Sequence, residues 1–385
     1  MKIGINALFF QHPASGSGQY LAHLQATLSE IDRQNEYLLF GPQPAPVTPA
    51  FPYQVCPAPS FTARNKNIQK LVWEQWTGPL AARHAGVDLF HVPYFAPPLF
   101  PGVSTVVTIH DVIPLRLPAY LPDVKVRAYM RLMARAAHSA RMIITVSQHA
   151  KRDIVDVLRI PPERVRVTYE AAGEEYRPLA DPAVLAAARA RYGIGERYIF
   201  YLGGLDQRKN VPQLVRAFAQ AYRQLGNPNL QLFISGDPDR KKGPLFPDPR
   251  TVPLDPDVRE RVIYRFVEDE DKATIYSGAS LFVFPSLYEG FGLDPLEAMA
   301  CGAPVVCSNR SSLPEVVGDA AISIDPENTD ALADAICRVL SSESLQADLR
   351  ARSLKRAAGF SWRKTAEETL SVYEEVMAGN ARPHK

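Results

Sequence analysis

Cysteine is scarce in this chain, and no two cysteines have the spacing of a metal site. No CxxC pair or zinc-type cluster of Cys and His occurs among the four, Cys56, Cys301, Cys307 and Cys337. Sparse, unpatterned cysteine is typical of a reducing compartment. We therefore expect a cytoplasmic protein, which leaves open a peripheral position at the inner face of a membrane.

Long apolar runs and one-sided charge are also missing. No apolar stretch approaches the roughly 20 residues that span a bilayer. Gln11 and His12, rather than a small-residue cleavage site, follow the N-terminal run MKIGINALFF, which predicts a first β-strand instead of a signal peptide. Lys and Arg total 43 and Asp and Glu 41, for a formal charge of +2. This balance gives no basic footprint for nucleic acid, and we expect no such partner.

What the chain does contain is a regular alternation of short apolar runs and helical patterns. This alternation predicts parallel sheets covered on both faces. Strands are predicted over 2–9, 36–40, 88–92, 104–109 and 141–146, and again over 198–204, 230–236, 262–266, 281–286 and 304–308. Helices are predicted after Gly18, over about 68–85 and over about 123–139.

The same pattern starts twice, which predicts two domains. The 385 residues exceed the roughly 250–300 at which single cores stop growing. We predict an N-terminal doubly wound domain over 1–172 and a C-terminal one over 173–361, with a final helix over 362–378 that can pack back on the first. Ligands of open α/β sheets bind outside the carboxyl ends of the strands, so the two domains are expected to face each other across a cleft.

The strongest chemical signal is YEGFGLDPLEAMACGAPVVCS, residues 288–308. A glycine loop follows a predicted strand and precedes a helix, for which Asp294 is a good N-cap. Backbone N–H groups at such a helix N-terminus can bind an anion or a hydroxyl. Two simpler interpretations stay open, because Glu297 has capping-box spacing from Asp294 and Glu289 can be a solvated loop residue.

A second segment, GGLDQRKNVPQLVRAF at 203–218, also runs from a glycine turn into a helix. Arg208 and Lys209 lie beside the helix N-terminus, where two cations repel each other unless a partner neutralises them. A diphosphate would do so, through the guanidinium fork, the ammonium and the helix dipole. Asp206 is the acid nearby in the sequence, and a solvated basic turn is the alternative. As a loop cation, Lys209 is expected to bury little.

Two weaker signals lie in the first domain. The segment ASGSGQYL, 14–21, suggests a phosphate loop but is an incomplete dinucleotide fingerprint, since Leu21 holds the third glycine position; a plain flexible turn is the alternative. His110 and Asp111 end an apolar strand, where α/β proteins collect reactive groups. A neutral imidazole there can hydrogen-bond a sugar hydroxyl, unless a local turn satisfies it.

Together these segments resemble a known family. Glu289 and Glu297, with seven residues between them within EGFGL…LEAMACG, closely resemble the E-x7-E signature of retaining GT-B glycosyltransferases. The other segments follow in the order found in family 4, which includes bacterial mannosyltransferases, and the resemblance runs from Met1 to about Met377. Asp294-Pro295 departs from the family pattern, in which Pro usually follows Leu directly.

The resemblance implies a role for each matching residue. Arg208 and Lys209 would hold the donor diphosphate, Glu297 the ribose, and Glu289 the hydroxyls of the transferred sugar. His110 would face that sugar as a catalytic residue. The remaining donor-binding positions are Gly16, Ser17, Gly18, Asp111, Val267, Phe291, Gly292 and Leu293.

The resemblance further implies a hexosyl transfer that retains anomeric configuration and needs neither metal nor cofactor. The donor would be a nucleotide sugar, GDP-mannose by first preference or a UDP- or dTDP-hexose, and the acceptor a glycan or lipid-linked glycan. A GT-B epimerase or hydrolase and a non-catalytic sugar-nucleotide sensor are the alternatives. A peripheral membrane contact is also expected, because Arg127, Arg131 and Arg135 form a stripe opposite the apolar face of helix 123–139. A solvated basic face is the alternative and the more common meaning of such a stripe.

Overall fold

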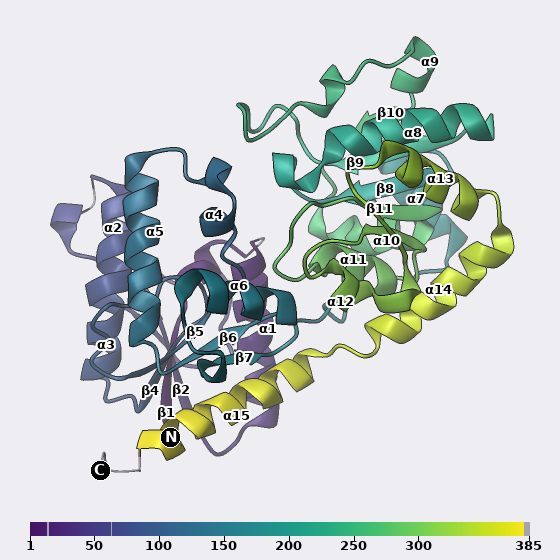
Figure 1. Ribbon diagram of the computed structural model, residues 1–385. Coiled ribbons are helices and arrows are strands. Elements are labelled where there is room, and N and C mark those ends of the chain that lie inside the picture. The colour runs from purple at the N-terminus through teal and green to yellow at the C-terminus, as the bar shows by residue number, and fades with distance from the viewer. Residues whose placement is uncertain (14, 63, 381–385) are drawn as a thin grey trace. The chain divides into compact units, whose positions relative to one another are not determined.

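The computed structural model describes residues 1–13, 15–62 and 64–380, which form two compact units. Unit 1 comprises the chain up to Glu170 together with the segment from Ser361 onward, and unit 2 comprises Ala171–Phe360 (Figure 1). The boundary predicted after residue 172 lies two residues from this division. Each unit has its own parallel sheet with helices packed against it, which confirms the predicted fold class.

The sheet described in unit 1 has seven parallel strands in the order β3-β2-β1-β4-β5-β6-β7. They are β1 Lys2–Asn6, β2 Glu36–Gly41, β3 Tyr53–Val55, β4 Leu89–Val92, β5 Ser104–Thr108, β6 Met142–Thr145 and β7 Val165–Val167. The sequence did not predict the edge strand β3, because its three residues are half-buried or exposed and form no apolar run.

Helices pack against this sheet to form the unit 1 core, which includes Phe90, Val107, Met133 and Ile154. They are α1 Gly16–Ile31, α2 Lys66–Val72, α3 Gly78–His84, α4 Ile113–Arg116, α5 Val124–Ala136, α6 Gln148–Leu158 and α15 Trp362–Asn380. A π-helical turn, Trp73–Thr77, joins α2 to α3 where one continuous helix was predicted. The final helix α15 packs on α1, so it belongs to unit 1.

Unit 2 has a sheet whose described strands are six and parallel, in the order β10-β9-β8-β11-β12-β13. They are β8 Tyr198–Leu202, β9 Gln231–Ser235, β10 Val262–Tyr264, β11 Leu281–Phe284, β12 Val305–Ser308 and β13 Ile322–Ile324. The helices are α7 Pro182–Tyr192, α8 Val211–Leu225, α9 Pro256–Arg259, α10 Lys272–Gly278, α11 Leu293–Ala300, α12 Leu313–Val317, α13 Thr329–Leu340 and α14 Glu343–Ala357.

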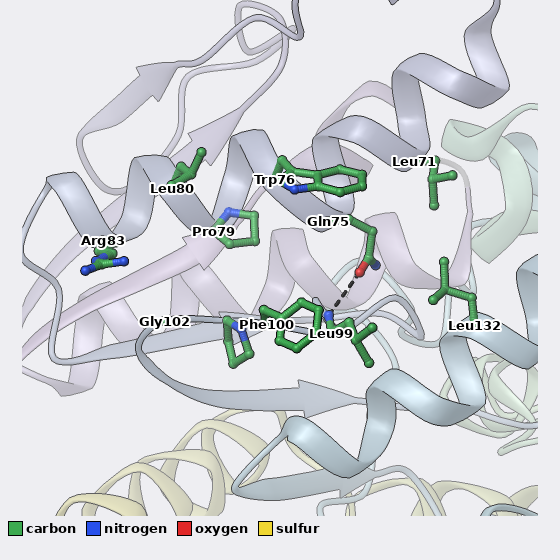
Figure 2. Close-up of a pocket in the computed structure, with 11 residues that line it drawn as sticks. Leu71, Gln75, Trp76, Pro79, Leu80, Arg83, Leu99, Phe100, Gly102 and Leu132 are labelled. Carbon is green, nitrogen blue, oxygen red and sulfur yellow. Dashed lines mark hydrogen bonds between the residues drawn. The ribbon is translucent and has the colours of Figure 1, made fainter.

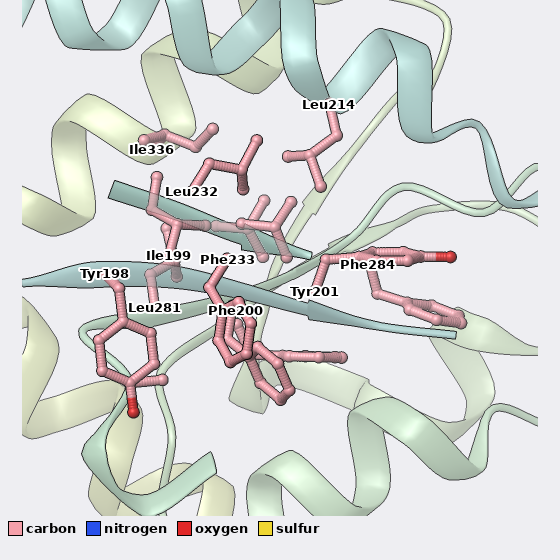
Figure 3. Packing of buried hydrophobic residues seen from close by; sticks show 14 of the residues in the cluster. Tyr198, Ile199, Phe200, Tyr201, Leu214, Leu232, Phe233, Leu281, Phe284 and Ile336 are labelled. Atoms are coloured by element: carbon pink, nitrogen blue, oxygen red, sulfur yellow. The ribbon is translucent and has the colours of Figure 1, made fainter. Parts of the chain in front are cut away.

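The middle strands of unit 2 are buried on both faces, as a parallel sheet between helix layers requires. Phe200 on β8 lies 5.3 Å from the ring of Phe233 and 5.2 Å from that of Tyr276, while Leu214 and Ile336 cover the sheet from α8 and α13 (Figure 3). Burial of such side chains stabilises the unit by about 1.5–3 kcal/mol each. This packing fixes the carboxyl ends of β8 and β11, from which the candidate site is built.

Candidate functional site

The strand order of unit 2 brings its two strongest sequence segments together. From β8 the chain moves to β9 and β10 on one side of the sheet, and then returns to β11 on the other side. Such a switch point opens a crevice at the carboxyl ends of the two strands. The loop after β8 carries Arg208 and Lys209, and the loop after β11 carries Glu289. Leu287 N–H donates to the Arg208 carbonyl at 2.8 Å, and Arg208 Nη1 donates to the Tyr288 carbonyl at 2.7 Å.

Glu289 forms ion pairs with both cations. Its Oε2 lies 2.6 Å from Arg208 Nη1, and its Oε1 lies 2.8 Å from Lys209 Nζ. Ser286 Oγ donates to the same Oε1 at 2.6 Å. Burial would raise the pKa of the Glu289 carboxyl, but the Lys209 and Arg208 charges and the two hydrogen bonds lower it to about 2. Glu289 is therefore a buried, ionised carboxylate and not the solvated loop residue of the simpler interpretation.

The expectation for Lys209 was wrong. This side chain is only 9% exposed, and its ammonium lies 4.6 Å above the ring of Phe284 and 3.4 Å from Asp294. Its main counter-charge is Glu289, eighty positions away in the sequence, rather than Asp206, whose carboxylate lies 3.5 Å from Arg208 Nε. The two cations are thus held in place by one shared carboxylate, and a solvated basic turn is excluded.

The helix after the glycine loop begins earlier than predicted. Gly292, with φ of 122°, is the N-cap of α11, and Asp294 lies inside the first turn. No side chain caps this end, so its first N–H groups keep their capacity to bind an anion. Gly292 is required here because that φ strains any residue with a side chain. Phe291, Gly292 and Leu293 therefore stand where the loop enters the helix, as the sequence predicted.

Glu297 does not form the capping box that its spacing permits, since Asp294 is not the N-cap. Its carboxyl is buried, and Tyr276 Oη donates to Glu297 Oε2 at 3.4 Å. Burial and the nearby Asp294 carboxylate raise the pKa of Glu297 well above its usual range. A buried carboxyl group among hydroxyl groups is suited to exchange hydrogen bonds with the hydroxyls of a ligand.

The glycine segment of unit 1 is the first turn of α1 rather than a loop before it. Ser15 is the N-cap, and its Oγ accepts from Gly18 N–H at 3.2 Å. A Cβ on Gly18 would lie 2.2 Å from the His12 carbonyl oxygen, which explains glycine at this position. The neighbouring Gly16 has open space around it and no such steric reason, and Ser17 follows it in the first turn of α1. Residue 14, which opens the segment, lies outside the described residues.

His110 follows β5 and is held from both sides. Its Nδ1 lies 3.1 Å from Glu170 Oε1, and its Nε2 lies 3.3 Å from the Pro93 carbonyl oxygen. Both partners only accept hydrogen bonds, and only the doubly protonated ring donates from both nitrogens. The structure therefore favours an imidazolium where the sequence suggested a neutral ring. The adjacent Asp111 accepts from Ile113 N–H at 2.9 Å and shapes the turn.

The same contacts determine the direction in which the pKa of His110 is shifted. Burial favours the neutral ring, but the hydrogen bond and charge of Glu170, together with Asp111, raise the pKa above its usual value. The Tyr20 ring packs edge-on at 4.9 Å. Glu170 is itself buried and was missed in the sequence, because it stands 60 positions away in an unremarkable run, VTYEAA.

The remaining predicted contact, Val267, lies after β10 and is fully buried, and its N–H donates to Ser235 Oγ at 3.2 Å. A cavity of about 480 Å³ opens beside it and is lined in part by Gly236, Phe266 and Glu268.

Serines near the E-x7-E loop were also missed. Ser311 Oγ accepts from Glu289 N–H at 2.9 Å, and Ser312 Oγ donates to the Phe291 carbonyl at 2.6 Å. Short hydroxyl side chains carry no pattern that distinguishes such anchors from ordinary loop serines.

Comparison with known proteins assigns each unit to a family model. Residues 187–356 match the model described as glycosyl transferases group 1, and residues 14–171 match that of glycosyltransferase family 4. The O-antigen chain mannosyltransferase B of Escherichia coli is 35% identical over 272 residues, which cover 70% of each chain. A serotype-specific mannosyltransferase WbdA of the same species is 30% identical over 278 residues.

The chain spans about a third of that WbdA protein, since the match covers 71% of this chain and 34% of the relative. Among solved structures, sucrose-phosphate synthase from Thermosynechococcus elongatus superposes with a TM-score of 0.74 at 21% identity, covering 98% of this chain and all of the other. That likeness supports the two-unit GT-B fold.

Proposed function

The chain belongs to the group 1, family 4 glycosyltransferases, and we propose that it transfers a hexose, with mannose preferred, from a nucleotide sugar to a glycan or lipid-linked glycan. Transfer would retain anomeric configuration and proceed without a divalent metal. Mannose is the first choice because mannosyltransferases are among its relatives. The observation that carries the proposal is the pairing of Arg208 and Lys209 with Glu289 at the carboxyl ends of β8 and β11.

The cluster suits a diphosphate better than any neutral ligand. Arg208 and Lys209 share Glu289 as their nearest counter-charge, while Asp206 and Asp294 lie farther from them, at 3.5 and 3.4 Å. The uncapped N-terminus of α11 adds positive potential. A donor diphosphate would exchange with Glu289 as the partner of Arg208 and Lys209. The Glu289 carboxylate would then accept hydrogen bonds from hydroxyls of the transferred sugar. This exchange joins the two roles that the resemblance implies for these residues.

The same residues account for the reaction without a metal. As the bond between the anomeric carbon and the phosphate oxygen breaks, negative charge grows on the phosphate, and preorganised cations stabilise it. The acceptor oxygen bonds to the anomeric carbon on the same face. Its proton passes to the departing phosphate oxygen, so no separate base is required. Binding that strengthens as the bond breaks raises kcat rather than affinity alone.

The nucleoside would lie toward β9 and β10. The cavity of about 480 Å³ beside Val267 offers the exposed ring of Phe266 for stacking. Glu297, with its raised pKa and tyrosine neighbours, would exchange those contacts for the ribose hydroxyls. We prefer a guanosine diphosphate donor, with uridine and deoxythymidine as the competing nucleosides.

We also propose that α5 touches an anionic membrane surface. Arg127, Arg131 and Arg135 are exposed, whereas Met130 and Met133 on the opposite face are buried in unit 1. Each basic residue near such a surface adds about 1 kcal/mol of attraction. No helix in the described part of the chain combines the length and apolar character needed to cross a membrane.

The test of donor binding is a calorimetric screen of GDP-, UDP- and dTDP-hexoses with the whole chain. We expect one nucleotide to bind clearly better than the others and its sugar to be transferred in a membrane extract that supplies acceptor. If no sugar nucleotide binds, the proposal fails, whatever the fold.

A further inference from the structure

Unit 1 exposes a cluster of apolar side chains around an apolar pocket. Among the described residues, ten large hydrophobic side chains are exposed, and half of them lie on α2–α3, the 96–102 loop and α5: Ile68, Trp76, Leu80, Phe100 and Val124. Phe100 is 84% exposed and Trp76 58%. Exposed apolar residues that gather in one place indicate an interaction site, whereas scattered ones do not.

Three of these side chains, Trp76, Leu80 and Phe100, line a pocket with a volume of about 190 Å³ (Figure 2). Its walls are Leu71, Trp76, Leu80, Leu99, Phe100 and Leu132, among others. Its polar side chain Gln75 is already satisfied, because it donates to the Pro97 carbonyl and accepts from Leu99 N–H. Arg83 stands at one end of the pocket, where no hydrogen bond or ion pair joins it to another described residue. The pocket thus offers apolar walls and one cationic end.

A π-helical turn directs the side chain of Trp76 towards the surface. Gly78 N–H donates to the Trp73 carbonyl, five residues back, which widens the turn between α2 and α3. Trp73 is consequently 1% exposed and Trp76 58%, although they lie three positions apart. Such insertions in helices frequently occur at functional sites.

The surrounding surface is strongly basic. Segments 64–84 and 123–139 carry eight Lys or Arg but two Asp or Glu, whereas the whole chain has a formal charge of +2. One of the two acids, Glu74, is buried and paired with Lys70 and the Tyr129 hydroxyl. These bonds also hold α2 beside α5, so both segments belong to one surface. An anionic partner complements this charge. Between two such partners, an anionic membrane would use both the basic residues and the apolar pocket, whereas an acidic protein groove would use only the basic residues.

We propose that this surface of unit 1 docks on an anionic phospholipid bilayer and that the pocket between Trp76 and Phe100 receives part of one acyl chain. The lipid phosphate would meet Arg83 at the end of the pocket. This inference rests on the peripheral contact proposed for α5 and adds the apolar half of the site. Trp suits the boundary between headgroups and hydrocarbon, where one end of its ring is apolar and the other is wet, and Phe suits the apolar face that enters the hydrocarbon.

The test uses Trp76 as its own probe. Of the three tryptophans, Trp73 and Trp362 are buried, so lipid chains can reach only Trp76. The whole protein is mixed at low salt with phosphatidylglycerol vesicles whose acyl chains carry bromine. We expect the Trp76 emission to shift to the blue and to be quenched, and we expect Trp76→Phe to lose the quenching. Vesicles of zwitterionic phosphatidylcholine alone should bind poorly.

Phe100→Asp distinguishes the contribution of the pocket to vesicle binding from that of the arginine stripe on α5. It should lower vesicle affinity by roughly ten- to a hundredfold, because the exposed Phe100 ring that would enter the bilayer is replaced by a charged side chain. Phe266→Asp alters a comparably exposed Phe, 52%, in unit 2 and should leave vesicle binding unchanged. If vesicles bind but brominated chains do not quench Trp76, or if Phe100→Asp binds normally, the pocket inference is overturned while the α5 contact stands. If anionic vesicles do not bind at all, both fail, and donor binding is unaffected by that result.

Discussion

Replacing Lys209 with Ala tests the diphosphate site at its most buried cation. The variant loses one charge-assisted hydrogen bond to phosphate, which contributes about 1.5–3 kcal/mol. Because phosphate charge grows as the glycosidic bond breaks, part of that energy appears only in the transition state. We therefore expect kcat to fall roughly ten- to several-hundred-fold, with a smaller loss of donor affinity. Lys209→Arg should rescue incompletely, since a planar fork does not replace a point charge.

The same variant should also be less stable. Stripping a buried charge of its partner costs about 3–5 kcal/mol, but Arg208 remains 2.6 Å from Glu289, so we expect about 1–2 kcal/mol. At about 2–4 °C per kcal/mol, the Tm of unit 2 should fall by several degrees. Glu289 has a folded-state pKa of about 2, below its unfolded value. The stability that the ionised Glu289 contributes is therefore present above its unfolded pKa and is lost as the pH falls towards 2. Without Lys209, that loss should begin at higher pH.

The measurement is steady-state kinetics with the preferred donor, beside thermal unfolding at several pH values. Lys241→Ala is the matched control, because Lys241 also lies over a phenylalanine ring, at 5.1 Å from Phe246, but is exposed and pairs with no carboxylate in the described structure. That variant should keep wild-type kcat and Tm. A near-normal kcat/KM for Lys209→Ala would remove the diphosphate from this loop and refute the reasoning.

Three further results are expected. Glu289→Gln should cripple turnover while leaving nucleoside diphosphate affinity equal or higher, since both cations lose a competing carboxylate; Glu297→Gln should mainly weaken the nucleotide, and equal effects of the two on affinity would argue against these roles. Full turnover should persist in excess EDTA, and strict dependence on Mg²⁺ or Mn²⁺ would contradict the metal-free mechanism. Glu170→Gln should move the alkaline limb of the kcat profile to lower pH. His110 is faced by Glu170, Asp111, His91 and Tyr20, and its pKa is raised above the usual value. The imidazolium and the stability that the His110–Glu170 pair contributes are therefore present below about pH 6.5 and are lost as the pH rises through the raised pKa. An unshifted limb, with Glu163→Gln as the exposed control, would show that the pair does not act on turnover.

The strands and long helices could be read from the sequence because they are buried apolar runs and amphipathic stripes. β8 and β11 lie within one or two residues of their predicted ends. The edge strands β3 and β13 were not predicted, since three-residue strands carry too little apolar pattern. The π-helical turn was hidden for a related reason, because periodicity does not register one extra residue in a helix.

The candidate site was predicted as a set of segments but not as a set of contacts. Sequence spacing located Arg208, Lys209 and Glu289, yet it could not show that one carboxylate neutralises both cations across the β8–β11 switch point. The pairing of Glu170 with His110 was hidden likewise, because long-range ion pairs leave no local pattern. The placement of Asp294 was wrong because the helix starts at Leu293, after a glycine that needs no side-chain cap.

The most direct test of the central claim compares nucleoside diphosphate with nucleoside monophosphate by calorimetry, in the wild type and in Lys209→Ala. The second phosphate should improve binding to the wild type by about tenfold or more, since it adds charge-assisted hydrogen bonds at Arg208 and Lys209. In Lys209→Ala most of that improvement should disappear, while the monophosphate binds as before. An unchanged ratio of the two affinities in the variant would mean that the diphosphate lies elsewhere, and the account of this site would be wrong.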